Sequence, residues 1–132
     1  MDYKQLMIEE LKQYRGRIAG VDSIKQQLAE IEEELADSAT DEERRLSLIV
    51  LREHLRTSLS VVASQVSRMA AGLATLSDTD RKLLELFYID RKYGHVDAAC
   101  ELLFVDSYSA VYLHKDAALK RLTVACYGMT EI

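Results

Sequence analysis

Polar and aromatic side chains with hydrogen-bond donors are concentrated on one predicted helix near the end of this chain. The first turns of that helix carry Tyr108, Ser109, Tyr112 and Lys115, and its later turns carry Lys120 and Arg121. Donors on the exposed first turns of a helix can contact base edges in the major groove of DNA. Donors further along such a helix are better placed for backbone phosphates. We therefore expect these six residues to form a DNA-binding face.

The sequence contains no motif that indicates catalysis, cofactor binding or metal binding. Cys100 and Cys126 are isolated, and the three histidines, His54, His95 and His114, stand at no metal-ligand spacing. No glycine-rich phosphate loop, Gly-x-Ser-x-Gly or Glu-x-x-His motif occurs. The sequence thus predicts no catalytic residue, no cofactor and no metal site, so we expect no enzyme. The cysteines are expected to be small buried hydrophobes of a cytoplasmic protein.

The elements that must position these side chains are predicted to be helices throughout. The 132 residues include no proline and only five glycines, and 48% are hydrophobic. Proline and glycine disfavour helix interiors, so their scarcity favours long helices. No alternating apolar run indicates a strand. The longest apolar run is also far below the ~20 residues that span a membrane. We predict an all-α fold with no membrane segment.

Residues 1–75 are predicted to form a long, coiled-coil-like helical hairpin. Apolar positions recur at steps of three and four over 2–36 and again over 41–74. Gly16 and Gly20 precede a slip in the first stripe, where we expect a kink or short break. Thr40 and Glu43 fit a capping box that starts the second helix. A short polar loop between two striped helices favours an antiparallel pair.

Additional apolar residues broaden the surface of this hairpin beyond one stripe. They are Leu6, Met7 and Ile8 in the first helix and Leu46, Ile49 and Val50 in the second. Spare apolar surface at this spacing predicts a homodimer or a partner helix. The alternative is that this surface packs onto the C-terminal helices.

Residues 76–132 are predicted to form three shorter helices, over 78–91, 96–103 and 108–127. Ser77 and Ser107 stand where caps are expected, and Gly94 and Gly128 stand where helices are expected to end. The predicted inward face of the last two helices and their turn consists of Val96, Ala99, Cys100, Leu103, Val105, Val111, Ala118, Leu119 and Leu122. This order predicts a helix-turn-helix unit.

Short matches in register add a resemblance to a known family. They are Leu76-Ser-Asp-Thr-Asp-Arg, Leu86-Phe-Tyr-Ile-Asp-Arg, Gly94-His-Val, Ala110-Val-Tyr, Lys115-Asp, Ala118-Leu-Lys-Arg-Leu-Thr and Tyr127-Gly. Over about its last 55 residues the chain resembles the sigma-region-4-like regulators carried by phages and prophages of Gram-positive bacteria. The resemblance implies a phage-type transcription regulator that binds double-stranded DNA and can also contact RNA polymerase.

The chain departs from that group around the turn and on the last helix. Phe104 replaces a usual glycine, and the turn looks one residue longer. Leu113 and Ala117 occupy positions that are often basic in the group. His114 stands where an apolar residue is expected, so we expect it to be partly buried. These departures reduce the positive charge available for phosphates.

Overall charge leaves a second function open. The net charge is −5, and neither part is basic, with 10 basic and 13 acidic residues before residue 76 and 7 and 9 from there on. DNA-binding domains usually carry a basic excess. The sequence therefore predicts a DNA-binding transcription regulator. The alternative is a helical adaptor or phage assembly component that binds protein.

Overall fold

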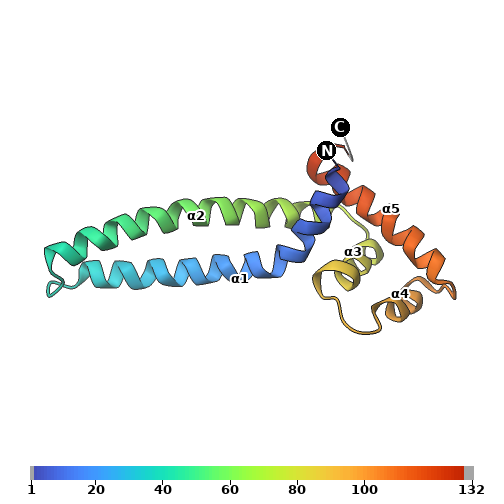
Figure 1. The fold of residues 1–132 in the computed structure, drawn as a ribbon, viewed down its shortest axis with the longest axis horizontal. Helices are drawn as coiled ribbons and strands as arrows, with labels where there is room; N and C mark the ends of the chain where they lie inside the picture. Colours follow the sequence, from blue (N-terminus) through green and yellow to red (C-terminus); the bar gives the residue numbers. More distant parts are fainter. Residues whose placement is uncertain (1, 130–132) are drawn as a thin grey trace. The chain divides into compact units, whose positions relative to one another are not determined.

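The computed structural model describes residues 2–129, and the elements in this part of the chain are all helices (Figure 1). They are α1 (Tyr3–Ala36), α2 (Glu42–Ala74), α3 (Asp78–Leu84), the π-helix η1 (Glu85–Ile89), α4 (His95–Leu103) and α5 (Tyr108–Tyr127). The predicted all-α class is confirmed. Helix α1 continues through Gly16 and Gly20, so the short break expected there does not occur. None of the described helices has the length and apolar character needed to cross a membrane.

Helix α2 begins one residue later than the predicted cap implies. The carboxylate of Asp41 accepts the backbone N–H of Arg44 at 2.7 Å and so caps the helix. The hydroxyl of Thr40 instead donates to the carbonyl of Glu34 at 2.7 Å. The predicted Thr40 cap is therefore wrong, because this hydroxyl already satisfies a carbonyl in the last turn of α1.

The third predicted helix is shorter than expected and ends in a wider turn. Ser77 caps it as predicted, since its hydroxyl accepts the N–H of Asp80 at 3.1 Å. The helix leaves α geometry at Glu85, and the N–H of Asp90 bonds to the carbonyl of Glu85 at 2.7 Å. Gly94 does adopt the left-handed conformation (φ 79°), but it directly precedes α4 rather than ending the third helix. Gly128 ends α5 as predicted.

The chain divides into two compact units, of which one is the segment Gly16–Val66. In this segment α1 and α2 pack side by side in opposite directions (Figure 1). Three residues form its buried core, Ile31, Leu48 and Leu55. The partly buried residues that pack around them are Ile24, Leu28 and Leu35. The core is thus a single apolar seam between two helices.

The loop of this unit is held by an arginine from the first turns of α2. The guanidinium of Arg45 donates to the carbonyls of Leu35 at 2.7 Å, Asp37 at 2.9 Å and Thr40 at 3.3 Å. Carbonyls at a helix end lack partners within the helix, so one side chain here satisfies several of them. The connection between α1 and α2 is consequently fixed by hydrogen bonds rather than by apolar burial.

The other compact unit contains the first turns of α1, the last turns of α2 and the C-terminal helices. It comprises the chain up to Arg15 and from Ser67 onward. Its larger core takes buried side chains from four helices, α1, α2, α3 and α5: Met7, Leu11, Met69, Leu73, Leu84, Ala118, Leu119 and Leu122. Residues 2–15 and 67–74 therefore pack with the C-terminal helices. The boundaries between the two compact units thus lie between residues 15 and 16 and between residues 66 and 67, whereas the sequence predicted a boundary between residues 75 and 76.

Two ion pairs add to this contact between segments distant in the sequence. The guanidinium of Arg15 makes two hydrogen bonds to the carboxylate of Asp90, at 2.8 and 3.0 Å. The hydrogen bond from Arg15 is the main reason that the pKa of Asp90 lies below its usual value. Arg68 donates to Glu10 at 2.6 Å. These pairs are largely solvent-exposed, so they fix geometry more than they add stability.

Candidate nucleic-acid interface

Helices α4 and α5 pack against α3 and η1 through a second apolar core. Leu83, Phe87, Ala99 and Val111 are buried in it. Partly buried residues that pack against them include Val96, Cys100, Leu103 and Val105. Further along α5, Ala118, Leu119 and Leu122 enter the first core. All nine residues predicted to face inward are thus buried or partly buried, and α5 presents its opposite side to solvent.

The turn between α4 and α5 is closed by backbone hydrogen bonds around Phe104. The N–H of Phe104 bonds to the carbonyl of Glu101 at 3.3 Å, and that of Val105 bonds to Cys100 at 3.1 Å. This pair of bonds is the Schellman arrangement, which requires a left-handed residue in its middle. Phe104 has that conformation (φ 56°), although its side chain is 95% exposed. The backbone is therefore strained at Phe104, a position that glycine would occupy without strain.

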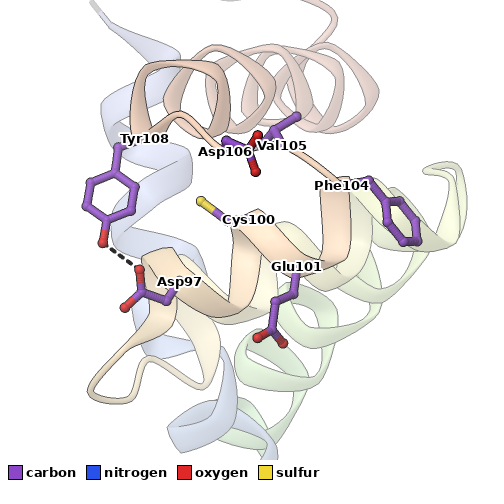
Figure 2. Close-up of a pocket in the computed structure, with 7 residues that line it drawn as sticks. All are labelled: Asp97, Cys100, Glu101, Phe104, Val105, Asp106 and Tyr108. Carbon is purple, nitrogen blue, oxygen red and sulfur yellow. Dashed lines mark hydrogen bonds between the residues drawn. The ribbon is translucent and has the colours of Figure 1, made fainter.

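Tyr108, the first residue of α5, contacts α4. Its hydroxyl donates to the carboxylate of Asp97 at 2.5 Å (Figure 2). This hydrogen bond is the largest reason that the pKa of Tyr108 lies above its usual value. The ring remains largely exposed. The predicted groove residue is thus accessible, and its orientation is set by an acidic neighbour.

Two further predicted residues lie on the exposed side of the first turns of α5. Ser109 is exposed, and Tyr112 is 44% exposed while the edge of its ring packs on Phe87 with 5.7 Å between centroids. Leu113 beside them is also exposed. His114 is exposed as well, which corrects the expectation of partial burial.

Lys115 does not extend into solvent from this surface. Its side chain is only 15% exposed, and Nζ lies 2.8 Å from Asp116. Nζ also lies 5.4 to 5.9 Å from the ring centres of Phe87, Tyr88 and Tyr112. Burial lowers the pKa of Lys115, but interactions with Asp116 and Tyr88 outweigh burial and leave the pKa above its usual value. The lysine is charged but recessed among aromatic rings.

The two basic residues further along α5 differ in their surroundings. Arg121 is exposed, and it donates to the carboxylate of Asp80 in α3 at 2.7 Å. Lys120 is exposed, and within residues 2–129 no carboxylate lies within 4.0 Å of its amine. Of the three predicted cations on α5, Lys120 is thus the one that is exposed and has no carboxylate partner among the described residues.

Sequence reasoning missed a second group of exposed cations before α4. Arg91, Lys92 and Tyr93 are all exposed in the connection between η1 and α4. With Tyr108 they line one surface hollow at the start of α4. The adjacent Arg91-Lys92 pair was the available signal, but only the fold brings it next to the first turn of α5.

A neighbouring hollow beside the turn is acidic. It is lined by Asp97, Cys100, Glu101, Phe104, Val105, Asp106 and Tyr108. Figure 2 shows the carboxylates around its mouth, with the Cys100 thiol between them and the Phe104 ring projecting away. Carboxylates here repel phosphate, so a nucleic acid on this side would have to avoid the hollow.

The described residues contain no group of histidine, cysteine and carboxylate side chains arranged to hold a metal ion. Cys100 and Cys126 are free thiols and are half-buried rather than fully buried. Burial is the main reason that the pKa of Cys126 is raised. Comparison with known proteins finds no matching family, no similar curated protein and no similar solved structure.

Proposed function

We propose that this protein is a DNA-binding transcription regulator of the phage or prophage type. In this proposal the α1–α2 pair is a helical hairpin, and α3 to α5 form a sigma-region-4-like helix-turn-helix unit. One observation carries it. The first turns of α5 keep Tyr108, Ser109 and Tyr112 exposed on one side, while Val111 and Ala118 on the other side are fully buried. A recognition helix in the major groove needs one exposed side that contacts the bases and one buried side that packs on the rest of the protein.

Contacts to phosphate would come from a different set of cations than the sequence alone indicates. Lys120 supports the proposal because it is exposed and lies on α5. Arg91 and Lys92 support it because they flank the first turns of α5 through the hollow that they share with Tyr108. Lys115 and Arg121 contribute less, because each already contacts a carboxylate.

The modest number of available cations sets the expected salt dependence. Each neutralised phosphate contributes roughly −0.9 to the slope of log affinity against log salt. Three available cations therefore predict a slope of about −3. Such a slope implies weak binding to arbitrary DNA, so a DNA site or RNA polymerase would have to supply the remaining affinity.

The experiment is a salt titration of fluorescence anisotropy with labelled promoter fragments from a host and a phage. Arg91→Glu together with Lys92→Glu should weaken binding to every fragment and reduce the slope by about 2. Lys4→Glu together with Lys25→Glu is the matched control, since both lysines are exposed on α1 and the net charge changes equally. An equal loss in both variants would assign the effect to net charge and count against the proposed face.

A helical adaptor or assembly component that binds protein is the second candidate. The observation that favours it is the acidic hollow formed with Asp97, Glu101 and Asp106, together with the pairing of Lys115 and Arg121. If no fragment binds at low salt, the DNA proposal fails. Binding of purified RNA polymerase by the same chain would then support the adaptor.

A further inference from the structure

The connection between η1 and α4 displays one tyrosine in a fixed turn. Tyr93 is fully exposed, so packing within the chain does not account for an aromatic ring here. The N–H of His95 bonds to the carbonyl of Lys92 at 3.2 Å, and Gly94 is left-handed with φ 79° and ψ 16°. Tyr93 itself has no positive φ. These features define a type II turn with Tyr93 at its corner and glycine at the position that requires it.

A surface hollow next to this turn combines aromatic rings with positive charge, and we call it the basic hollow. Its volume is about 710 Å³, which lies within the roughly 300–1,000 Å³ of sites that hold small organic groups. The residues that line it are Arg91, Lys92, Tyr93, Gly94, His95, Val96, Asp97 and Tyr108. The hollow is thus large enough for part of a polymer such as a nucleic-acid strand.

The charges around the basic hollow favour an anion. Arg91 and Lys92 are exposed, and neither forms an ion pair within residues 2–129. The neighbouring carboxylate of Asp90 already accepts two hydrogen bonds from Arg15. Asp97 is the single carboxylate in the lining, and it accepts a tyrosine hydroxyl. Two cations therefore face one carboxylate that already has a partner.

The second ring of the basic hollow is oriented by that hydrogen bond. Tyr108 donates to Asp97 at 2.5 Å, although the residue is 54% exposed. Proteins hold unpaired nucleotides with this combination, because bases stack on aromatic rings while cations contact the phosphates. A base inside a duplex cannot stack on a protein ring in this way, since neighbouring base pairs cover both of its faces.

We propose that the basic hollow binds a short unpaired stretch of a DNA strand. Tyr93 and Tyr108 stack on its bases, and Arg91 and Lys92 contact its phosphates. The inference rests on the proposed DNA-binding function and deepens it by naming the form of DNA that this site prefers. A duplex with an interrupted stretch of pairing could contact α5 and place its open strand at the start of α4.

The first test uses the full chain and three labelled DNAs of one sequence, compared by fluorescence anisotropy. They are a duplex, the same duplex with a short mismatched stretch, and the single strand. The last two should bind more tightly than the duplex. Tyr93→Ala should weaken their binding by about 10-fold and leave duplex binding unchanged, whereas Tyr93→Phe keeps the ring and should bind as the wild type does.

Phe104→Ala is the matched control for this test. Phe104 is also almost fully exposed, but it lines the acidic hollow, so its loss should change none of the three affinities. Equal binding of the intact and mismatched duplexes, or an equal loss on all three DNAs in Tyr93→Ala, would overturn the inference. Selective binding of intact promoter duplexes would then leave the proposed function standing. Binding of the single strand alone would do the reverse, and no binding to any DNA would overturn both.

A second test detects stacking directly. The chain has no tryptophan, so Tyr93→Trp introduces a single fluorescent reporter. Unlabelled single strand should quench this fluorescence, and adding Arg91→Glu and Lys92→Glu to the same variant should abolish the quenching at the same DNA concentration. Phe104→Trp is the control and should not be quenched. Equal quenching at both positions, or none at Tyr93→Trp, would contradict the proposed site.

Discussion

The two compact units of the molecule are stabilised in different ways. In the unit that contains α3 to α5, buried side chains from four helices meet, and Met7 from the first turns of α1 lies in the same core as Leu122 from α5. In the segment Gly16–Val66, three buried residues form one apolar seam. Outside this seam, α1 and α2 are connected by hydrogen bonds from Arg45 and by surface ion pairs. The first unit therefore has the more extensive core, although both units keep large apolar side chains exposed, such as Phe104 and Leu113 in the first and Val50 in the second.

This difference bears on what each unit can bind. A surface backed by a dense core keeps its side chains in place, as the ring of Tyr112 against Phe87 illustrates. Such a surface suits recognition of a rigid partner. An exposed apolar row suits another helix, because burial of that row supplies the main favourable free energy.

The largest loss of stability is expected for a substitution of Gly72. A β-carbon at this position would lie 2.5 Å from the Cys126 sulfur and 3.1 Å from Leu122, so α2 and α5 approach too closely for a side chain. Gly72→Ala should lower the free energy of unfolding by about 2 kcal/mol, measured by urea denaturation.

Gly20→Ala is the matched control in the other unit, because nothing lies within 4 Å of the corresponding position in α1. It should raise the free energy of unfolding by about 0.5 to 1 kcal/mol, through helix propensity alone. The same sign for both substitutions would contradict the difference in packing density between the units.

A smaller loss is expected where the segment Gly16–Val66 relies on hydrogen bonds. Arg45→Ala removes three donors to the loop carbonyls and should lower the free energy of unfolding by about 1 to 2 kcal/mol. Arg44→Ala removes only an exposed pair with Glu34 and should cost about 0.5 kcal/mol. Equal losses in thermal denaturation would show that the loop does not depend on Arg45.

A stabilising substitution is expected in the turn before α5. Phe104→Gly relieves a left-handed backbone conformation and should raise the free energy of unfolding by about 1 kcal/mol. Phe104→Ala keeps the backbone strain while removing the same exposed ring, and should be close to neutral. If both variants are destabilised, the ring contributes a contact that outweighs the strain.

Local patterns allowed much of the helical order to be predicted. The stripes over 2–36 and 41–74 and the caps at Ser77 and Ser107 are local features, since periodicity and caps depend on residues within about one turn. Errors arose where a side chain had two competing partners, as at Thr40, or where backbone bonding changed, as at Asp90. Those choices depend on atoms that sequence spacing does not place.

The helical character of the chain and its inward-facing residues follow from the sequence, because the apolar side of an amphipathic helix must be removed from water. The cations of the candidate interface that have no carboxylate partner become evident only from the packing of the helices. Asp80 pairs with Arg121 across 41 positions of the sequence, and Lys115 is enclosed by rings from another helix. Lys120 keeps its solvent exposure because no such partner packs beside it among the described residues. Electrostatic partners act over a few ångströms in space, so a list of charges along the chain does not reveal them.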